Sequence, residues 1–164
     1  MKQRYPKRYI PKSLTKREKI QQKKELEKSR KLYRKGKYHT RKVIKSHKSK
    51  ESKHIKKAKE LYDIDTIKPS KELSKKTGCS LEGLEKIVNK GRGAYYSSGS
   101  RVNQTPESWG LARLASSISG GKSAAIDINI LKNSCKKTSK TLKYAKQSIK
   151  KHGKGTRKVP KIYI

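Results

Sequence analysis

The chain has 164 residues, and its 47 Lys and Arg against 12 Asp and Glu give it a formal net charge of +35. Only 30% of the residues are hydrophobic and none is Phe, which is close to the composition of disordered chains and excludes a large apolar core. Because so charged a chain repels itself, we expect it to be ordered within a larger assembly.

The charge is unevenly distributed along the chain. Residues 1–62 carry a net charge of +20, residues 63–135 only +4, and residues 136–164 carry +11. The sequence therefore predicts a mainly α protein in three parts. These are a basic N-terminal arm with a long helix (1–69), a compact helical domain (70–135), and a basic C-terminal helix and tail (136–164).

The N-terminal arm should begin extended, because Pro6 and Pro11 disfavour helix at the residues before them. Thr15 and Glu18 then have the spacing of a capping box, which predicts a helix from about residue 16 to 35 that ends at Gly36. Residues 37–49 read as irregular, and apolar spacing predicts a shorter helix over 50–62.

The central part has repeated helix starts and stops. Ser and Thr caps and Gly stops predict helices over 70–76, 80–91 and 106–119. The segment 124–131 fits either a strand or a helix, and we favour a helix because no strand partner is evident. Ser139 begins a last helix that runs to residue 152 and is followed by an extended basic tail.

The segment 93–110, GAYYSSGSRVNQTPESWG, interrupts the lysine-rich pattern. It is expected to connect a helix ending at Gly91 to one starting at Thr105, with Trp109 largely buried. The candidate packing and interaction core in and beside it comprises Tyr95, Tyr96, Arg101, Trp109 and Arg113.

Catalytic and metal-binding motifs are not found. SISGGKS at 117–123 has Ser116 where a phosphate-binding P-loop needs its first Gly, and SSGSR at 97–101 is not a nucleophile elbow. The four His have no metal-ligand spacing, so no cofactor, metal or small-molecule substrate is expected. An enzyme with Tyr95 or Tyr96 as nucleophile is a weaker alternative. No signal peptide is evident, which favours free thiols for Cys79 and Cys135.

Aromatic and apolar residues punctuate the basic arms and are candidate anchors: Tyr5, Tyr9, Ile10, Tyr33, Tyr38, Ile162 and Tyr163. Three interpretations are open. The arms contact phosphates and stack on bases, they occupy grooves between other proteins, or they lie on an anionic membrane surface.

Several segments are similar to an uncharacterised domain family of nucleocytoplasmic large DNA viruses. These are RYIPKSLTKREK (8–19), SRKLYRKGKY (29–38), residues 75–124, which include KGRGAYYSSGSR and SWG, and the final matching segment IL…C at 130–135. The resemblance implies a viral context and no demonstrated activity. This sequence differs mildly from the family pattern at Val102 and Glu107.

Two functions follow as expectations. The first is a virion structural protein, a minor capsid or cement protein on the inner capsid surface that binds other capsid proteins. It would be found in the virion, and in the host cytoplasm or nucleus during assembly. The alternative is a nucleic-acid-binding protein, either genome-condensing or ribosome-associated.

Overall fold

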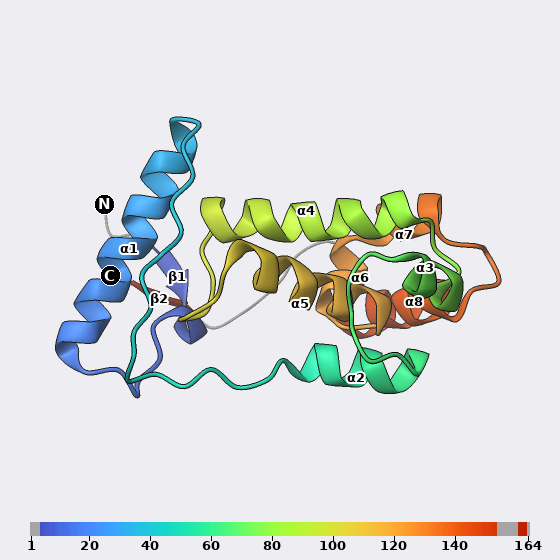
Figure 1. Cartoon of the computed structure of the whole chain (residues 1–164), viewed down its shortest axis with the longest axis horizontal. Helices are drawn as coiled ribbons and strands as arrows, with labels where there is room; N and C mark the ends of the chain where they lie inside the picture. The colour runs from blue at the N-terminus through green and yellow to red at the C-terminus, as the bar shows by residue number, and fades with distance from the viewer. Residues whose placement is uncertain (1–3, 154–160, 164) are drawn as a thin grey trace. The chain divides into compact units, whose positions relative to one another are not determined.

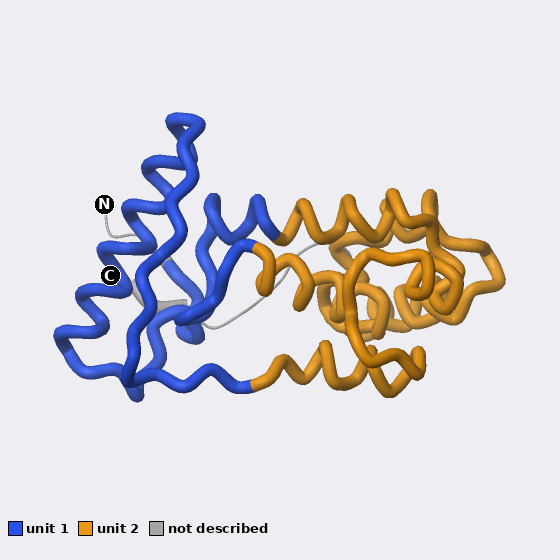
Figure 2. Tube along the Cα trace, viewed as in Figure 1, with its two compact units in different colours: residues 1–50, 92–106, 158–164 blue, residues 51–91, 107–157 orange. Residues whose placement is uncertain are grey.

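The computed structural model describes residues 4–153 and 161–163. Within them the chain is mainly helical, as predicted, with eight α-helices and one two-stranded sheet (Figure 1). It forms two compact units (Figure 2). Unit 1 comprises residues 1–50, 92–106 and 158–164, and unit 2 comprises residues 51–91 and 107–157.

This division differs from the predicted three parts. The predicted N-terminal arm folds with residues 92–106 in unit 1. The predicted central domain is too narrow, because the core of unit 2 also takes in Ala58 and Tyr62 from before residue 70, and Leu142 and Ala145 from after residue 135. Charge zones along the sequence therefore do not coincide with the compact units.

Unit 1 is built on one long helix and a short sheet. Strand β1 (Arg4–Pro6) pairs antiparallel with β2 (Lys161–Tyr163), and a 3-10 turn, η1 (Lys7–Tyr9), follows β1. Helix α1 (Lys16–Arg34) starts at the predicted capping box of Thr15 and Glu18. Gly36, with a φ of +72°, follows its end. Residues 37–49 are irregular, as predicted.

The interior of unit 1 is small and rich in tyrosine. Its buried residues include Tyr5, Tyr9, Ile10, Leu26 and Tyr95. A separate apolar cluster joins three distant segments, through Leu14, Ile44 and Val102. Residues 4–6 are extended, as Pro6 and Pro11 suggested, but they form a paired strand. Residues 5–10 are thus part of a packed unit and not a free arm.

Unit 2 contains the remaining helices. They are α2 (Lys53–Tyr62), α3 (Lys71–Thr77), the first part of α4 (Leu81–Ser97), α5 (Pro106–Ile118), α6 (Lys122–Ile126), α7 (Ile128–Ser134) and α8 (Lys140–His152). Ser52, Ser70 and Ser139 cap α2, α3 and α8 through their side chains. The ambiguous segment 124–131 is helical, divided between α6 and α7. Of the expected C-terminal tail, residues 154–160 and 164 lie outside the described part.

A hydrogen-bonded chain crosses the apolar core of unit 2. The buried Tyr62 hydroxyl donates to the carbonyl of Ile118 at 2.5 Å and lies 2.6 Å from the Thr141 hydroxyl. The Thr141 hydroxyl donates in turn to the carbonyl of Thr77 at 3.1 Å. Burial raises the pKa of Tyr62 to about 12. The phenol therefore stays neutral and links α2, α5 and α8.

The predicted end of a helix at Gly91 is wrong. Helix α4 continues through Gly91 to Ser97. A side chain at Gly91 would place its Cβ 2.5 Å from the Gly110 Cα, so the glycine permits close approach of α5 to α4 (Figure 1). The helix instead ends before Gly99, which has a φ of +104° and donates its N–H to the Ala94 carbonyl at 3.0 Å.

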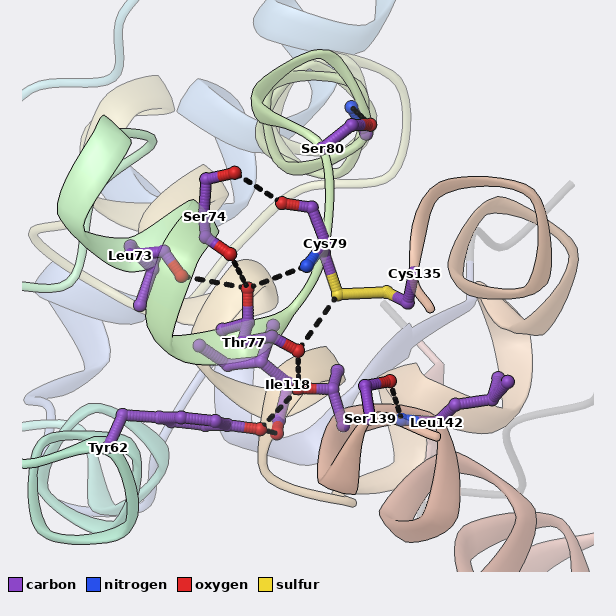
Figure 3. The surroundings of a disulfide bond; sticks show 12 residues. Tyr62, Leu73, Ser74, Thr77, Cys79, Ser80, Ile118, Cys135, Ser139 and Leu142 are labelled. Atoms are coloured by element: carbon purple, nitrogen blue, oxygen red, sulfur yellow. Dashed lines mark hydrogen bonds between the residues drawn. A yellow bond between two sulfur atoms is a disulfide. The ribbon is translucent and has the colours of Figure 1, made fainter. Parts of the chain in front are cut away.

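The expectation of free cysteines is also wrong. Cys79 and Cys135 form a disulfide inside unit 2 (Figure 3). The segments that follow α3 and α7 lie antiparallel, with hydrogen bonds from Ser80 N to Ser134 O at 2.8 Å and from Lys136 N to Gly78 O at 2.9 Å. The two cysteines are 56 residues apart, and their pairing follows from the fold and not from a local motif.

Candidate nucleic-acid interface

Positive charge is concentrated in unit 1. Its sequence segments contain 25 basic and 3 acidic side chains, a net charge of +22, whereas the segments of unit 2 contain 22 and 9, a net charge of +13. Unit 1 is also the shorter of the two. Its surface is therefore the stronger attractor of polyanions.

Helix α1 presents much of this charge on one side. Six of its cations are exposed, and we call them the α1 stripe: Lys16, Arg17, Lys24, Lys28, Lys31 and Arg34. At 3.6 residues per turn they fall within about a third of the helix circumference, along a length of about 28 Å. The opposite side carries the buried residues Gln22, Glu25, Leu26 and Ser29. The helix thus buries a polar face and exposes a basic one.

Two of the three acids of unit 1 are hydrogen-bonded to groups outside the α1 stripe. Glu18 accepts hydrogen bonds from Thr15 N–H and the Ser46 hydroxyl, which lower its pKa. Burial raises the pKa of Glu25, but the Lys42 N–H at 2.8 Å and His39 at 2.9 Å outweigh it, so the net shift is downward. Glu27, the third acid, is partly buried and falls within the same third of the helix circumference as the stripe, so it offsets part of the stripe's charge.

A buried arginine fastens the loop of residues 37–49 to the end of α4. The Arg41 guanidinium lies over the Tyr95 ring and donates to Ser29 Oγ at 2.9 Å, Tyr95 O at 2.8 Å and Ser100 Oγ at 2.6 Å. The Arg41 N–H also donates to the Tyr95 hydroxyl at 2.9 Å. Burial lowers the pKa of Arg41 from its ordinary value, yet an arginine stays charged.

Three tyrosines next to this anchor form what we call the tyrosine cluster: Tyr33, Tyr38 and Tyr96. The Tyr96 ring contacts the ring of Tyr95 edge-on, with the ring centres 5.2 Å apart. It stacks on the Tyr33 ring, with the centres 5.9 Å apart and an interplanar angle of 10°. Tyr38 lies 5.0 Å from Tyr96 and 6.1 Å from Tyr33. Tyr38 is 72% exposed, so the cluster reaches the surface.

The predicted packing and interaction core is divided between the units. Tyr95, Tyr96 and Arg101 belong to unit 1, whereas Trp109 and Arg113 belong to unit 2. Arg101 is exposed as a residue, but partial desolvation of its guanidinium and the nearby Arg8 lower its pKa. Trp109 is only partly buried, although it was expected to be largely buried. The five residues are thus not one site.

Arg113 takes part in a buried ionic cluster in unit 2. Its guanidinium binds the buried carboxylate of Asp127 through two nitrogens, at 2.7 and 3.0 Å. Lys90 Nζ and the Ser117 hydroxyl also donate to Asp127, at 3.0 and 2.9 Å. This arrangement satisfies the carboxylate from three directions, which is the geometry of a structural ion pair rather than of an acid–base pair.

The candidate arm anchors have different surroundings. Tyr5, Tyr9 and Ile10 are buried within unit 1 itself, so their side chains are not available to bind a groove on another protein. Tyr33 and Tyr38 form the tyrosine cluster. Ile162 and Tyr163 lie in β2, and their side chains fall outside the described part.

Arg41 and Asp127 are the central residues that the sequence did not reveal. Arg41 is one of many basic residues in a lysine-rich stretch, and its neighbours Ser29 and Tyr95 are 12 and 54 residues away. Asp127 stands at the N-terminus of α7, but its side chain makes no capping hydrogen bond. A rare acid within an apolar stretch is the one local signal that marks Asp127.

Within residues 4–153 and 161–163, no group of three or more His, Cys, Asp or Glu is arranged to hold a metal ion. In the same part of the chain, no helix has both the length and the apolar character needed to cross a membrane. A model for a family of unknown function, DUF5824, matches residues 6–133. No curated protein and no solved structure matches the chain.

Proposed function

The chain belongs to the DUF5824 family, whose function is unknown, and from its own residues we propose that it binds nucleic acid through unit 1. The observation that carries this proposal is the α1 stripe, six exposed cations along one side of a helix in a unit of net charge +22. The proposed activity is binding, with no chemical step.

The physical basis is the release of counterions. A protein that neutralises phosphates with Lys and Arg frees condensed cations, so its affinity falls with salt in proportion to the number of phosphates contacted. The internal bonds of Glu18 and Glu25 leave the stripe available for this purpose. Such binding is indifferent to base sequence, because phosphates carry no sequence information.

The test compares two matched triple variants of the full chain on a fluorescent 20-base-pair duplex, by anisotropy over a range of salt concentrations. The first is Lys24→Gln, Lys28→Gln and Lys31→Gln in the α1 stripe. The control is Lys143→Gln, Lys146→Gln and Lys150→Gln, which removes three exposed cations from α8 in unit 2. We expect the α1 variant to reduce the slope of log affinity against log salt by about 2 to 3, and the control by less.

Three results would contradict the proposal. The wild-type chain binds neither the duplex nor a single strand at low salt, the α1 variant binds like the wild type, or the α8 variant loses as much affinity as the α1 variant. Anionic vesicles are the competing target of the same charge. If phosphatidylserine vesicles remove the chain from the duplex at equal anion concentration, the membrane surface is the preferred partner and the proposal fails.

A structural role in the virion of a large DNA virus is the second candidate. Two observations favour it. Disulfides persist in secreted proteins and virions and are rare in the cytosol, and this chain has one. The three most exposed large apolar side chains, Ile20, Tyr38 and Val43, lie in unit 1 and would suit a capsid neighbour. Mass spectrometry of purified particles tests it, and detection in infected cells but never in particles would contradict it.

A further inference from the structure

The tyrosine cluster is not explained by the packing of unit 1. Unit 1 has buried tyrosines, Tyr5, Tyr9 and Tyr95, and these fill its interior. Tyr33 and Tyr96 are only partly buried, and Tyr38 is 72% exposed although its ring contacts both. An aromatic group that reaches solvent in a strongly basic unit has the composition of a stacking surface for bases.

Two of the three rings are held in place before any ligand arrives. Tyr96 is adjacent to Tyr95, whose ring, hydroxyl and carbonyl are all contacted by Arg41. Tyr33 lies in the last turn of α1 and stacks on Tyr96. A stacking surface that is already ordered loses little side-chain entropy on binding.

Cations adjoin the cluster on the chain. Arg34, Lys35 and Lys37 lie between Tyr33 and Tyr38 and are all exposed. A base stacked on Tyr38 would therefore have its flanking phosphates within reach of long basic side chains. Aromatic rings interleaved with cations are the pattern by which proteins bind single strands without sequence preference.

We propose that the tyrosine cluster of Tyr33, Tyr38 and Tyr96 binds unpaired bases, so that unit 1 prefers single-stranded to double-stranded nucleic acid. This inference rests on the proposed function and adds to it the class of nucleic acid. Bases in a duplex have their faces covered by their neighbours, so the exposed ring of Tyr38 is useful only to an unpaired base or a strand end.

The experiment measures binding of the full chain to a 20-nucleotide oligothymidylate and to a 20-base-pair duplex at the same salt concentration. The variant is Tyr38→Ala, which removes the most exposed ring and so disturbs folding least. Tyr38→Phe is the conservative variant, because it keeps the ring. The matched control is Val43→Ala, which trims another exposed apolar side chain in the same loop.

The wild-type chain is expected to bind the single strand more tightly than the duplex. Tyr38→Ala should lower affinity for the single strand by about 5-fold or more and leave duplex affinity unchanged. Tyr38→Phe and Val43→Ala should bind both like the wild type. Tyrosine emission should fall when the single strand binds and less so in Tyr38→Ala.

The failures of the two proposals are distinguishable. Binding of both nucleic acids without a single-strand preference, or an equal loss for both in Tyr38→Ala, overturns the base-stacking inference and leaves the binding function standing. Binding of neither overturns the proposed function itself. An unaltered single-strand affinity in Tyr38→Ala also overturns the inference, and points to a protein partner for the exposed ring.

Discussion

The guanidinium of Arg41 lies 3.7 Å from the centre of the Tyr95 ring, and it also donates a hydrogen bond to the backbone carbonyl of the same residue. The ring of Tyr95 therefore packs against the face of the guanidinium, and its carbonyl accepts from an N–H at the guanidinium edge. No carboxylate is hydrogen-bonded to this guanidinium among the described contacts, so neutral acceptors and the ring stabilise it. The contact joins the loop after α1 to the end of α4 inside unit 1.

Arg41→Lys should destabilise unit 1 by about 2 to 4 kcal/mol, although it keeps the charge. A lysine ammonium is a point charge and does not span Ser29, Ser100 and the Tyr95 carbonyl at once, so buried acceptors would be left without a donor. Hydrogen exchange with mass spectrometry should show lost protection in peptides covering residues 37–49 and 92–106. The matched control, Arg34→Lys at an exposed position of α1, should leave protection unchanged.

Asp127→Asn should destabilise unit 2 by about 3 to 5 kcal/mol at neutral pH, because it leaves the Arg113 guanidinium without its buried counter-charge. Burial raises the pKa of Asp127, but hydrogen bonds and charge from Arg113, then Lys90 and Ser117, outweigh it and lower the pKa below its ordinary value. The carboxylate thus contributes stability above the unfolded pKa of about 3.9, and this is lost as pH falls through the lower folded value.

The measurement is denaturant unfolding followed by the fluorescence of Trp109, the only tryptophan, which lies in unit 2. The difference between wild type and Asp127→Asn should be largest near pH 7 and should shrink as pH falls below the unfolded pKa of about 3.9. Glu82→Gln removes an exposed carboxylate that pairs with Lys86 on α4, and it should change stability by less than about 1 kcal/mol. A difference that does not vary with pH would contradict the assigned role.

The starts of the helices could be predicted because caps are local. The side chains of Thr15, Ser70 and Ser139 each accept from the backbone N–H three residues ahead, and the structure has all three caps. The mainly α fold follows from these starts and from the Gly stops. The helix end predicted at Gly91 was wrong because glycine can either end a helix or allow two helices to approach closely. The sequence does not show that Gly110 packs against Gly91, and this contact decides between the two roles.

The units and the candidate interface could be predicted only in part. The sequence placed tyrosines among cations and so indicated Tyr33, Tyr38 and Tyr96, but it could not bring them together. The cluster depends on Arg41 reaching Tyr95 across 54 residues, and such pairings leave no periodicity in the sequence. The disulfide was not predicted for the same reason, because its two cysteines are 56 residues apart.

Gly110→Ala should destabilise unit 2 by up to about 2 kcal/mol. Its new Cβ would lie 2.7 Å from the carbonyl oxygen of Val88, so α5 would have to move away from α4. The strain of overpacking, about 1 to 3 kcal/mol, exceeds the gain in helix propensity of about 1 kcal/mol. Thermal unfolding monitored by Trp109 fluorescence would detect it.

Gly93→Ala is the matched control in the same helix α4. A Cβ there would meet only the Tyr33 hydroxyl at 3.8 Å, an ordinary contact. This variant should therefore be neutral or stabilise the chain by up to about 1 kcal/mol through helix propensity. If Gly110→Ala were as stable as Gly93→Ala, the close packing of α4 on α5 would be contradicted.

Removing the disulfide should cost unit 2 a large share of its stability. Cys79 and Cys135 are separated by 56 residues, and closing a loop of this length stabilises a fold by about 4 kcal/mol in the chain-entropy model. The double variant Cys79→Ser with Cys135→Ser should unfold at lower denaturant than the oxidised wild type. Reduction should lower the wild-type midpoint toward that of the variant and leave the variant's own midpoint unchanged.

Thiol titration of the denatured, unreduced chain provides the control. It should find no reactive thiol, because both cysteines of the chain are consumed by the bond. Two titratable thiols in protein purified without reductant would contradict the disulfide. Trp109 lies inside the loop that the disulfide closes, whereas Tyr38 lies in unit 1. After reduction, the Trp109 signal of unfolding should therefore change at a lower denaturant concentration than single-strand binding at the tyrosine cluster. A simultaneous loss of both would show that the units do not unfold independently.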